Sequence, residues 1–482
     1  MAAIEEVPVS AISLERFRPV LGEGYAEVEE AIERTEEVLG GRIVWHVNST
    51  ARGGGVAEML QSLLAYGRGA GADLRWLTIS GNPDFFRVTK RIHNHLHESP
   101  GDGGPLGAEE REIYERAQFE AADELTRLAR KGDIVYIHDP QPAGLVSHVK
   151  SADVMVVWRC HIGIDHPGEL ARGAWEFLRR YVLDADAYVF SRQRFVWEGL
   201  DREKVWLVPP SIDVFSPKNQ ELEPGAVRSI LAVAGVGAGD HFTEALFHRM
   251  DGSTSRVDRP AELDQDGPVP EGAPLVSQVS RWDRLKDPVG LLTAFADHVG
   301  VEDAHLLIAG PSVADVADDP EGADVLADVR GRRESLPADV RARIHLATLP
   351  MDDVEENAAM VNAIQRRSDV VVQKSLAEGF GLTVAEAMWK ARPVVAGRVG
   401  GIQDQIVDCV SGVLVDDPAD LAAVGRAIDR LLREPERARE IGTAAKQRVI
   451  DQFLGTRHLL QYLGLLTGLL AADSGRAASR GS

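Results

Sequence analysis

Cysteine is almost absent from this 482-residue chain, which contains only Cys160 and Cys409. Two cysteines cannot build a disulfide framework, so we expect free thiols and a reducing compartment. Long hydrophobic runs are also absent, because the most apolar late segment, 459–470, includes Gln461 and Thr467 and is too short to span a bilayer. The first residues lack the basic start and apolar centre of a signal peptide. These features predict a soluble, cytoplasmic protein without a membrane partner.

Positive charge is scarce, because 53 Lys and Arg residues face 75 Asp and Glu residues and leave a net charge of −22. A surface this acidic repels nucleic-acid phosphates and anionic lipids, which excludes a general nucleic-acid or membrane-surface protein. Any anionic ligand must therefore be met by a local cluster of cations. Hydrophobic residues make up 44% of the chain, which is enough to build the cores of two large domains.

Short apolar segments alternate with helix-length segments along the chain, a pattern that predicts doubly wound, parallel α/β sheets. In the first half, an amphipathic helix is expected at 25–39, and strands are expected at 42–48, 74–79, 133–138, 154–160 and 187–191. The alternation then begins again, with strands expected at 275–279, 304–309, 343–347, 370–373 and 394–396. The predicted fold class is α/β, with two Rossmann-like parallel-sheet domains that face a cleft.

Breaks in this pattern predict the domain boundaries. Residues 1–212 form an N-terminal α/β domain, which the helix expected at 455–470 joins, and residues 213–454 form a second α/β domain. Residues 250–274 are rich in Asp, Gly and Pro and lack a periodic apolar pattern, which indicates a surface insertion. Residues 471–482 are expected to be a disordered tail.

The strongest local motif is EGFGLTVAE at 378–386, which follows an expected strand and opens an expected helix. Free backbone N–H groups at a glycine-rich helix N-terminus suit a phosphate. Glu378 and Glu386 bracket this turn, and their carboxylates could accept hydrogen bonds from sugar hydroxyls on either side of the phosphates. The pattern Thr383-x-x-Glu386 also matches a capping box, which is the structural alternative for Glu386.

A second motif is SRWDRLKD at 280–287, directly after the strand expected at 275–279. Open α/β sheets bind ligands at the carboxyl ends of their strands. Arg281 and Lys286 supply the concentrated positive charge that the chain otherwise lacks. A solvated turn is the structural alternative for this segment.

Three further features follow strands of the first half. Glycines at 53–55 allow the backbone to approach a ligand closely, although they do not form the G-x-G-x-x-G dinucleotide motif. Asp139 and His161 each stand at the carboxyl end of an expected strand. Each alone is more often a capping or turn residue. Together with the other motifs, however, they are expected to surround one predicted cleft.

Two patterns that resemble metal sites are assigned to other roles. Asp184 and Asp186 match a carboxylate pair that holds a metal in some sugar transferases, but they precede a strand, which favours a turn. His93, His95 and His97 lack a nearby Cys or Glu that completes a ligand set, so we expect no metal site there.

These motifs together resemble a retaining glycosyltransferase of family 4 with the GT-B fold. The resemblance extends to the trehalose synthase branch of that family through longer stretches between residues 42 and 400, namely HVNSTARGGGVAEML, NPDFFRVTKRIHNHLH, IHDPQPAGL, WRCHI, PPSID, QVSRWDRLKDP and EGFGLTVAEAMWK. These stretches are far more specific than the two glutamates alone.

The resemblance implies an activity, which is transfer of glucose from a nucleoside-diphosphate glucose (ADP- or UDP-glucose) to the anomeric hydroxyl of free glucose, giving α,α-trehalose. Arg281 and Lys286 would neutralise the diphosphate as negative charge builds on the leaving group. They would do the work of a metal, so no essential cofactor is expected and Mg²⁺ would be at most a stimulator. Self-association into a homodimer is left open.

The resemblance also assigns roles to other residues. Glu386 would bind the ribose hydroxyls, and Glu378 would bind hydroxyls of the donor glucose. His161 and Asp139 would contact the transferred and acceptor sugars. The remaining phosphate contacts would come from the backbone at Gly54, Gly55, Gly381, Leu382 and Thr383.

Three alternatives stay open at the level of the sequence. A trehalose phosphorylase shares these motifs and uses inorganic phosphate, which would leave the ribose role of Glu386 idle. A family 4 glucosyltransferase with another acceptor would differ in the region 82–97. A non-catalytic sensor of sugar nucleotides is disfavoured, because Arg281, Lys286 and Glu378 are all present.

Overall fold

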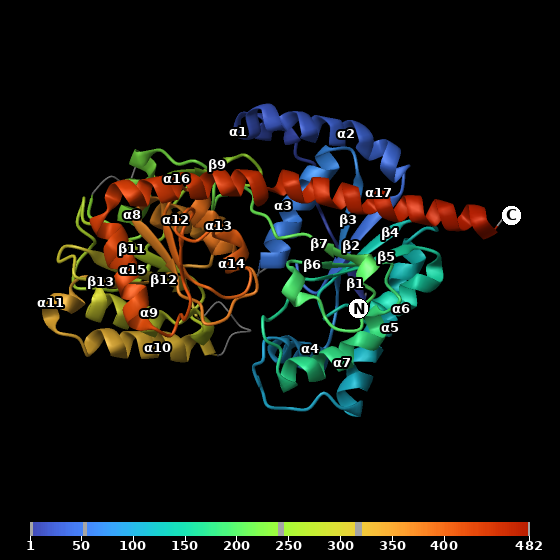
Figure 1. The fold of residues 1–482 in the computed structure, drawn as a ribbon, viewed down its shortest axis with the longest axis horizontal. Helices are drawn as coiled ribbons and strands as arrows, with labels where there is room; N and C mark the ends of the chain where they lie inside the picture. The colour runs from blue at the N-terminus through green and yellow to red at the C-terminus, as the bar shows by residue number, and fades with distance from the viewer. Residues whose placement is uncertain (1–2, 52–54, 240–244, 314–320, 481–482) are drawn as a thin grey trace. The chain divides into compact units, whose positions relative to one another are not determined.

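The computed structural model describes residues 3–51, 55–239, 245–313 and 321–480, with side chains as far as residue 473 (Figure 1). The chain separates into two compact units. Unit 1 comprises Met1–Ser211 and Phe453–Ser482, and unit 2 comprises Ile212–Gln452. Each unit is a doubly wound α/β domain, which confirms the predicted fold class.

A seven-stranded sheet lies at the centre of unit 1, with strand order β1-β3-β2-β4-β5-β6-β7. The strands are β1 (Ile4–Val7), β2 (Ile43–Asn48), β3 (Asp73–Ile79), β4 (Ile134–His138), β5 (Met155–Cys160), β6 (Ala187–Phe190) and β7 (Val205–Leu207). Neighbouring strands are parallel except β1, which pairs antiparallel to β3 at the edge. The strands β2, β4, β5 and β6 are buried along their whole length, which explains their continuous apolar runs.

Helices cover both faces of this sheet. They are α1 (Arg18–Leu21), α2 (Tyr25–Leu39), α3 (Gly55–Gly69), α4 (Pro83–Leu96), α5 (Ala108–Leu128), α6 (Leu145–Val149), α7 (Glu169–Val182) and α17 (Gly455–Arg480). One apolar core joins the sheet to α4, α5 and α7, and a second joins the opposite face to α3 and α17. The last helix of the chain therefore completes the core of unit 1.

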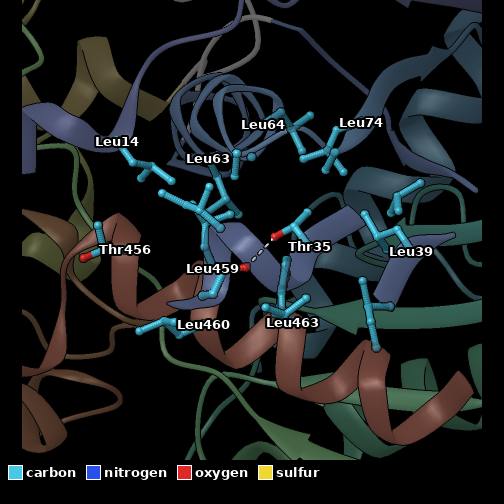
Figure 2. A pocket seen from close by; sticks show the side chains of 18 of the residues that line it. Leu14, Thr35, Leu39, Leu63, Leu64, Leu74, Thr456, Leu459, Leu460 and Leu463 are labelled. Carbon is cyan, nitrogen blue, oxygen red and sulfur yellow. Dashed lines mark hydrogen bonds between the residues drawn. The ribbon is translucent and has the colours of Figure 1, made fainter. Parts of the chain in front are cut away.

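Helix α17 packs against α2 and α3 around an apolar cavity of about 80 Å³. Leu63, Leu459 and Leu463 are among the side chains that line it (Figure 2). The hydroxyl of Thr35, which also lines the cavity, is satisfied by a hydrogen bond that it donates to the carbonyl oxygen of Ala31 at 2.8 Å. Among the described residues, no helix combines the length and apolar content needed to cross a bilayer.

The prediction of a disordered tail from residue 471 is wrong for residues 471–480, because α17 continues through Arg480. This segment, AADSGRAASR, is rich in alanine, the residue with the highest helix propensity. It also extends a helix that is already nucleated, so the cost of forming a first turn does not arise again.

Unit 2 contains a second seven-stranded sheet, with strand order β10-β13-β12-β11-β14-β15-β16. The strands are β10 (Glu262–Asp264), β11 (Leu275–Val279), β12 (His305–Pro311), β13 (Ile344–Leu349), β14 (Val370–Gln373), β15 (Val394–Gly397) and β16 (Val413–Val415). Its helices are α8 (Pro224–Val233), α9 (Pro288–His298), α10 (Glu321–Glu334), α11 (Ala338–Arg341), α12 (Val354–Arg367), α13 (Leu382–Trp389), α14 (Ile402–Gln405), α15 (Leu421–Arg433) and α16 (Pro435–Gln452).

The segment expected as a surface insertion, 250–274, is part of the fold of unit 2, so that prediction is wrong in part. Strands β8 (Leu246–His248) and β9 (Thr254–Arg256) form a hairpin, and β10 pairs antiparallel to β13 at the sheet edge. Val257 and Val269 are buried in one of the apolar cores of unit 2. Strands of three residues are too short to show a hydrophobic period, which is why the sequence pattern missed them.

Candidate active site

Strands β11 and β14 are parallel neighbours in unit 2, so their carboxyl ends bring two distant loops together. The backbone N–H of Leu376 donates to the carbonyl oxygen of Leu285 at 2.7 Å. Within the first loop, Asp283 accepts a hydrogen bond from the backbone of Leu285 at 2.7 Å, and buried Trp282 donates to the carbonyl oxygen of Pro311 at 2.9 Å. These hydrogen bonds fix the loop that carries Lys286, the residue after Leu285.

Lys286 forms an ion pair with Glu378, which the second loop supplies. Ser375 also donates its hydroxyl to the same carboxylate oxygen of Glu378 at 3.1 Å. The two charged side chains are 16% and 11% exposed, so the pair is less screened than a surface ion pair yet remains accessible. The structure therefore brings together two residues that the sequence singled out in separate motifs.

A second ion pair, between Lys374 and Asp287, supports the first and was missed in the sequence. Asp287 begins α9, where its Oδ1 atom accepts a hydrogen bond from the backbone N–H of Gly290 at 2.9 Å. Its backbone is left-handed, with φ at +46°. The available signal was the Asp-Pro sequence at 287–288, because proline is common at the first position of a helix.

Arg281 lies on the exposed side of the first loop. Its guanidinium is 3.4 Å from the carboxylate of Asp283, and its side chain is 56% exposed. An ion pair this open to water is weak, since solvent screens it. An anionic ligand could therefore displace Asp283 from Arg281 at little cost.

The turn at 378–386 is built as the start of α13. Gly381 is the N-cap of this helix and has φ at +81°, and Gln405 donates to the carbonyl oxygens of Phe380 and Gly381 at 2.5 and 3.2 Å. Leu382 and Thr383 then contribute the first N–H groups of α13, which have no acceptor within the helix. The capping-box alternative for Glu386 is wrong, because Thr383 lies inside the helix and bonds to Gln373 at 3.2 Å.

Glu386 is buried on α13 among cations that the sequence analysis did not single out. The Nζ atom of Lys218 is 3.7 Å from its Oε1 atom. Lys390, also buried, donates to the backbone oxygen of Glu386 at 3.1 Å and to the side chains of Asn219 and Gln365 at 2.9 and 2.8 Å. Burial holds the pKa of Lys390 well below its usual value, and the negative charge of Glu386 opposes that shift.

In unit 1, the neighbouring strands β4 and β5 bring Asp139 and His161 together. Asp139 accepts a hydrogen bond from the backbone N–H of His161 at 2.7 Å, and its own N–H donates to the carbonyl oxygen of Arg159 at 2.8 Å. Its backbone is left-handed, with φ at +66°. Burial raises the pKa of Asp139 to about 7, although the hydrogen bond from His161 opposes this shift.

His161 ends a row of three imidazoles, whose other two members, His46 and His138, are buried. His46 Nδ1 is 3.0 Å from His138 Nε2, and His138 Nδ1 is 3.2 Å from His161 Nε2. The buried Arg159 guanidinium contacts His161 and donates to the carbonyl oxygen of Val208 at 3.0 Å. The sequence analysis missed His46, His138 and Arg159, although each is a polar residue inside an apolar strand.

Burial keeps these histidines neutral. It lowers the pKa of His46 to about 3, and it holds the pKa values of His138 and His161 well below their usual range, with the charge of Arg159 acting in the same direction. His458 of α17 behaves likewise and bonds to the hydroxyl of Ser211 at 3.0 Å. This part of unit 1 therefore offers neutral hydrogen-bonding groups.

The remaining sequence candidates have other positions. Gly55 is the first residue of α3 and is exposed, whereas Gly54 lies outside the described residues. Asp186 is structural, because it accepts hydrogen bonds from Lys150 at 2.5 Å and from the backbone of Val156 at 2.8 Å. In the part of the chain that the structure describes, no three histidine, cysteine or carboxylate side chains gather as metal ligands.

Comparisons with known proteins decide the family. A family model described as "Trehalose synthase, N-terminal domain" matches residues 46–197, and one described as "Glycosyl transferases group 1" matches residues 261–448. The chain is 36% identical to the trehalose synthase of Pyrococcus horikoshii over 97% of this chain and 99% of that protein. It is 37% identical to the trehalose synthase of Rubrobacter xylanophilus over 92% and 94% of the two chains. The chain belongs to the trehalose synthase family of GT-B glycosyltransferases.

More distant proteins are also similar to this glycosyltransferase over most of its chain. It is 27% identical to the trehalose phosphorylase of Pleurotus pulmonarius, over 91% of this chain but 58% of the phosphorylase. The α,α-trehalose 6-phosphate synthase of Burkholderia multivorans superposes with a TM-score of 0.63 at 14% identity, over 92% and 100% of the two chains. Anabaena HepE in complex with UDP and glucose gives a TM-score of 0.57 at 14% identity, over 89% and 100%. These two likenesses show the fold.

The position of Glu378 in this glycosyltransferase depends on Gly400, which has φ at +48°. A Cβ atom at residue 400 would lie 1.6 Å from the backbone oxygen of Glu378. We therefore expect Gly400→Ala to lower the free energy of unfolding of unit 2 by about 2 kcal/mol. Urea titration measures the change, with Gly331→Ala in α10 as the control, because a Cβ at residue 331 meets no atom within 4 Å. Equal stabilities of the two variants would contradict this account.

The neutral histidines of unit 1 predict a loss of stability in acid. In the unfolded chain, His46, His138, His161 and His458 take up protons below about pH 6.5, whereas their folded-state pKa values lie well below this. The unfolded state thus binds more protons, so stability falls as the pH drops from about 6.5. Asp139 opposes this by about one proton between pH 4 and 7, because its folded-state pKa is raised.

We therefore expect unfolding of unit 1 near pH 5 to take up about three protons from these five groups. Urea unfolding between pH 5 and 7 gives the number from the slope of stability against pH. In His458→Phe the uptake should fall by about one proton. An unchanged slope in this variant would show that His458 is not held neutral.

Proposed function

We propose that this glycosyltransferase transfers glucose from a nucleoside-diphosphate glucose to the anomeric hydroxyl of free glucose, with retention of configuration, to give α,α-trehalose. The observation that supports this most is the Lys286–Glu378 ion pair beside the start of α13. This arrangement occurs in a chain with full-length similarity to trehalose synthases. It offers one cation, one sugar-binding carboxylate and free backbone N–H groups at one edge of the sheet.

Lys286 is proposed to bind the diphosphate without leaving Glu378. An ammonium group has three N–H donors, so one can serve the carboxylate while the others serve phosphate oxygens. Arg281 would exchange Asp283 for a phosphate oxygen, and the first N–H groups of α13 would donate hydrogen bonds to the same anion. The cations would thus stabilise the charge that develops on the leaving group, and Mg²⁺ would be at most a stimulator.

The carboxylates are proposed to bind the neutral parts of the donor. Glu378, held by Lys286 and Ser375, would accept hydrogen bonds from hydroxyls of the donor glucose. Glu386, held near Lys218, would accept them from the ribose hydroxyls. A phosphorylase that uses inorganic phosphate would leave this ribose site without a ligand.

Unit 1 is proposed to bind the sugars through Asp139 and His161. Retention requires either a carboxylate nucleophile or attack on the face that the leaving group departs from. We propose the second route, in which the leaving phosphate oxygen takes the proton of the acceptor hydroxyl. Catalysis would then come from orientation of the two sugars, exclusion of water and neutralisation of the diphosphate.

Product analysis tests the proposal directly. Glucose mixed with ADP-, UDP- or GDP-glucose should yield trehalose and one equivalent of nucleoside diphosphate. Lys286→Ala and Glu378→Ala should each lower kcat/KM at least 100-fold, because each removes a group proposed to act in the transition state. Lys131→Ala is the matched control, since the Lys131 side chain is 82% exposed in unit 1.

Two outcomes would contradict the proposal. Trehalose formed only from glucose 1-phosphate and glucose would support a phosphorylase, the second candidate that the Pleurotus relative favours. A different glucosylated product, made from another acceptor, would retain the glycosyltransferase but overturn the proposed substrate.

The pKa of Asp139 predicts a pH dependence. The proposed role needs the carboxylate form, which can only accept hydrogen bonds, and this form dominates above about pH 7. We therefore expect kcat/KM for glucose to rise through about pH 7 and then level off. In Asp139→Asn this rise of kcat/KM with pH should disappear, while binding of nucleoside diphosphate stays unchanged. If kcat/KM of Asp139→Asn rose through the same pH range, the titrating group would be a residue other than Asp139.

A further inference from the structure

Two buried polar side chains in unit 2 connect Glu378 to the start of α13. Gln373 is the last residue of β14 and is 2% exposed, and Ser375 follows it and is fully buried. A buried polar group costs folding free energy unless it forms hydrogen bonds, so both residues need partners. Because both are buried, any effect that they have on a ligand must act through a neighbouring residue.

The partners of these residues form one chain of hydrogen bonds. Thr383, the second residue of α13, donates its hydroxyl to Gln373 Oε1 at 3.2 Å. Gln373 Nε2 donates to Ser375 Oγ at 3.1 Å, and Ser375 Oγ donates to Glu378 Oε2 at 3.1 Å. The chain therefore begins in the first turn of α13 and ends on the carboxylate of Glu378.

The carboxylate sets the direction of this chain. An ionised carboxylate only accepts hydrogen bonds, so the hydroxyl of Ser375 must donate to Glu378. That hydroxyl has a single hydrogen and can only accept from Gln373, which must therefore present its NH₂ group. The amide oxygen of Gln373 then faces Thr383, which donates to it. If the amide were turned over, its oxygen would face the oxygen of Ser375 without a hydrogen between them.

The two carboxylate oxygens of Glu378 have different surroundings. Oε2 receives both protein contacts, which are the ion pair with Lys286 and the hydrogen bond from Ser375. Oε1 accepts no hydrogen bond from any residue that the structure describes. Each oxygen of a carboxylate can accept about two hydrogen bonds, so Oε1 keeps its capacity for a ligand.

We propose that Gln373 and Ser375 are positioning residues that fix the carboxylate of Glu378, so that the protein holds Oε2 and Oε1 accepts a hydrogen bond from a hydroxyl of the donor glucose. This role rests on the proposed function, in which Glu378 binds the donor sugar. Because the same amide of Gln373 also bonds to Thr383, it ties the carboxylate to the first turn of α13, where the diphosphate is proposed to bind. The contacts to the sugar and to the phosphates are then held in one geometry.

Urea unfolding tests the chain of hydrogen bonds without any substrate. Gln373→Met removes the amide with a side chain of similar length, and Ser375→Ala removes the hydroxyl. If the two residues belong to one chain, the shift of the unfolding midpoint in the double variant should be clearly smaller than the sum of the two single shifts. A shift equal to that sum would overturn the proposal, whatever product the enzyme makes.

Calorimetric binding of UDP and UDP-glucose, and of ADP and ADP-glucose, tests the positioning role, because only the second ligand of each pair carries a glucose. Gln373→Met should weaken binding of the sugar nucleotide roughly tenfold and leave binding of the free diphosphate unchanged. Gln118→Met is the control, since Gln118 is a buried glutamine of unit 1 whose amide donates to the carbonyl oxygen of Gln141. An equal loss for both ligands would overturn the role, because it would show a general effect on unit 2.

Glu378→Ala separates failure of this proposal from failure of the proposed function. If Gln373 acts through Glu378, Gln373→Met should lower kcat/KM roughly tenfold in the unsubstituted protein and cause no further loss in Glu378→Ala. A further loss would overturn the proposal and leave the glucosyltransferase activity established. If the unsubstituted protein binds neither sugar nucleotide, the proposed function fails and the positioning role fails with it. If Gln373→Met does not fold, Ser375→Ala breaks the same chain and replaces it in the binding and kinetic measurements.

Discussion

Parallel pairing of neighbouring strands is the constraint on which the candidate residues of each unit depend. In a parallel sheet, adjacent strands end at the same edge, so loops far apart in the chain become neighbours there. The pairing of β11 with β14 joins Lys286 to Glu378, and the pairing of β4 with β5 joins Asp139 to His161. Because both faces of each sheet are buried against helices, this edge is the natural place for groups that must meet a ligand.

Most of the fold could be predicted from the sequence, because buried parallel strands are continuous apolar runs and the helices between them are long. The expected helix at 25–39 and strand at 275–279 coincide with α2 and β11. The strands that were not predicted are either very short or only weakly apolar. Strand β1 has the sequence IEEV, and β10 has only three residues, so neither shows a period. Both take their structure from the strand beside them.

The candidate site could be predicted only as far as strand ends and glycine-rich turns reveal it. Lys286 and Glu378 were found because each follows an apolar strand. Lys218, Lys374 and Arg159 were not, because a single basic residue in a loop or strand has no distinctive spacing. The partners of such residues are set by tertiary contacts across about 90 to 170 positions, as for Lys374 with Asp287 and Lys218 with Glu386.

The candidate residues of the two units differ in how their charges are compensated. In unit 2, cations near the candidate site form ion pairs with carboxylates, as in the pairs Lys286–Glu378 and Lys374–Asp287. Compensated charges of this kind can be held partly buried and can still interact with an incoming anion, which would suit the proposed diphosphate in a chain with a net charge of −22.

In unit 1, buried Arg159 has no carboxylate within ion-pair distance in the described part of the chain, and it is surrounded instead by neutral imidazoles and a carbonyl oxygen. Its charge opposes protonation of His46, His138 and His161. A sugar is neutral and is recognised by the direction of its hydroxyl hydrogen bonds rather than by charge. For the proposed sugar ligand, a cation that keeps its neighbours neutral is more useful than a cation exposed to the substrate.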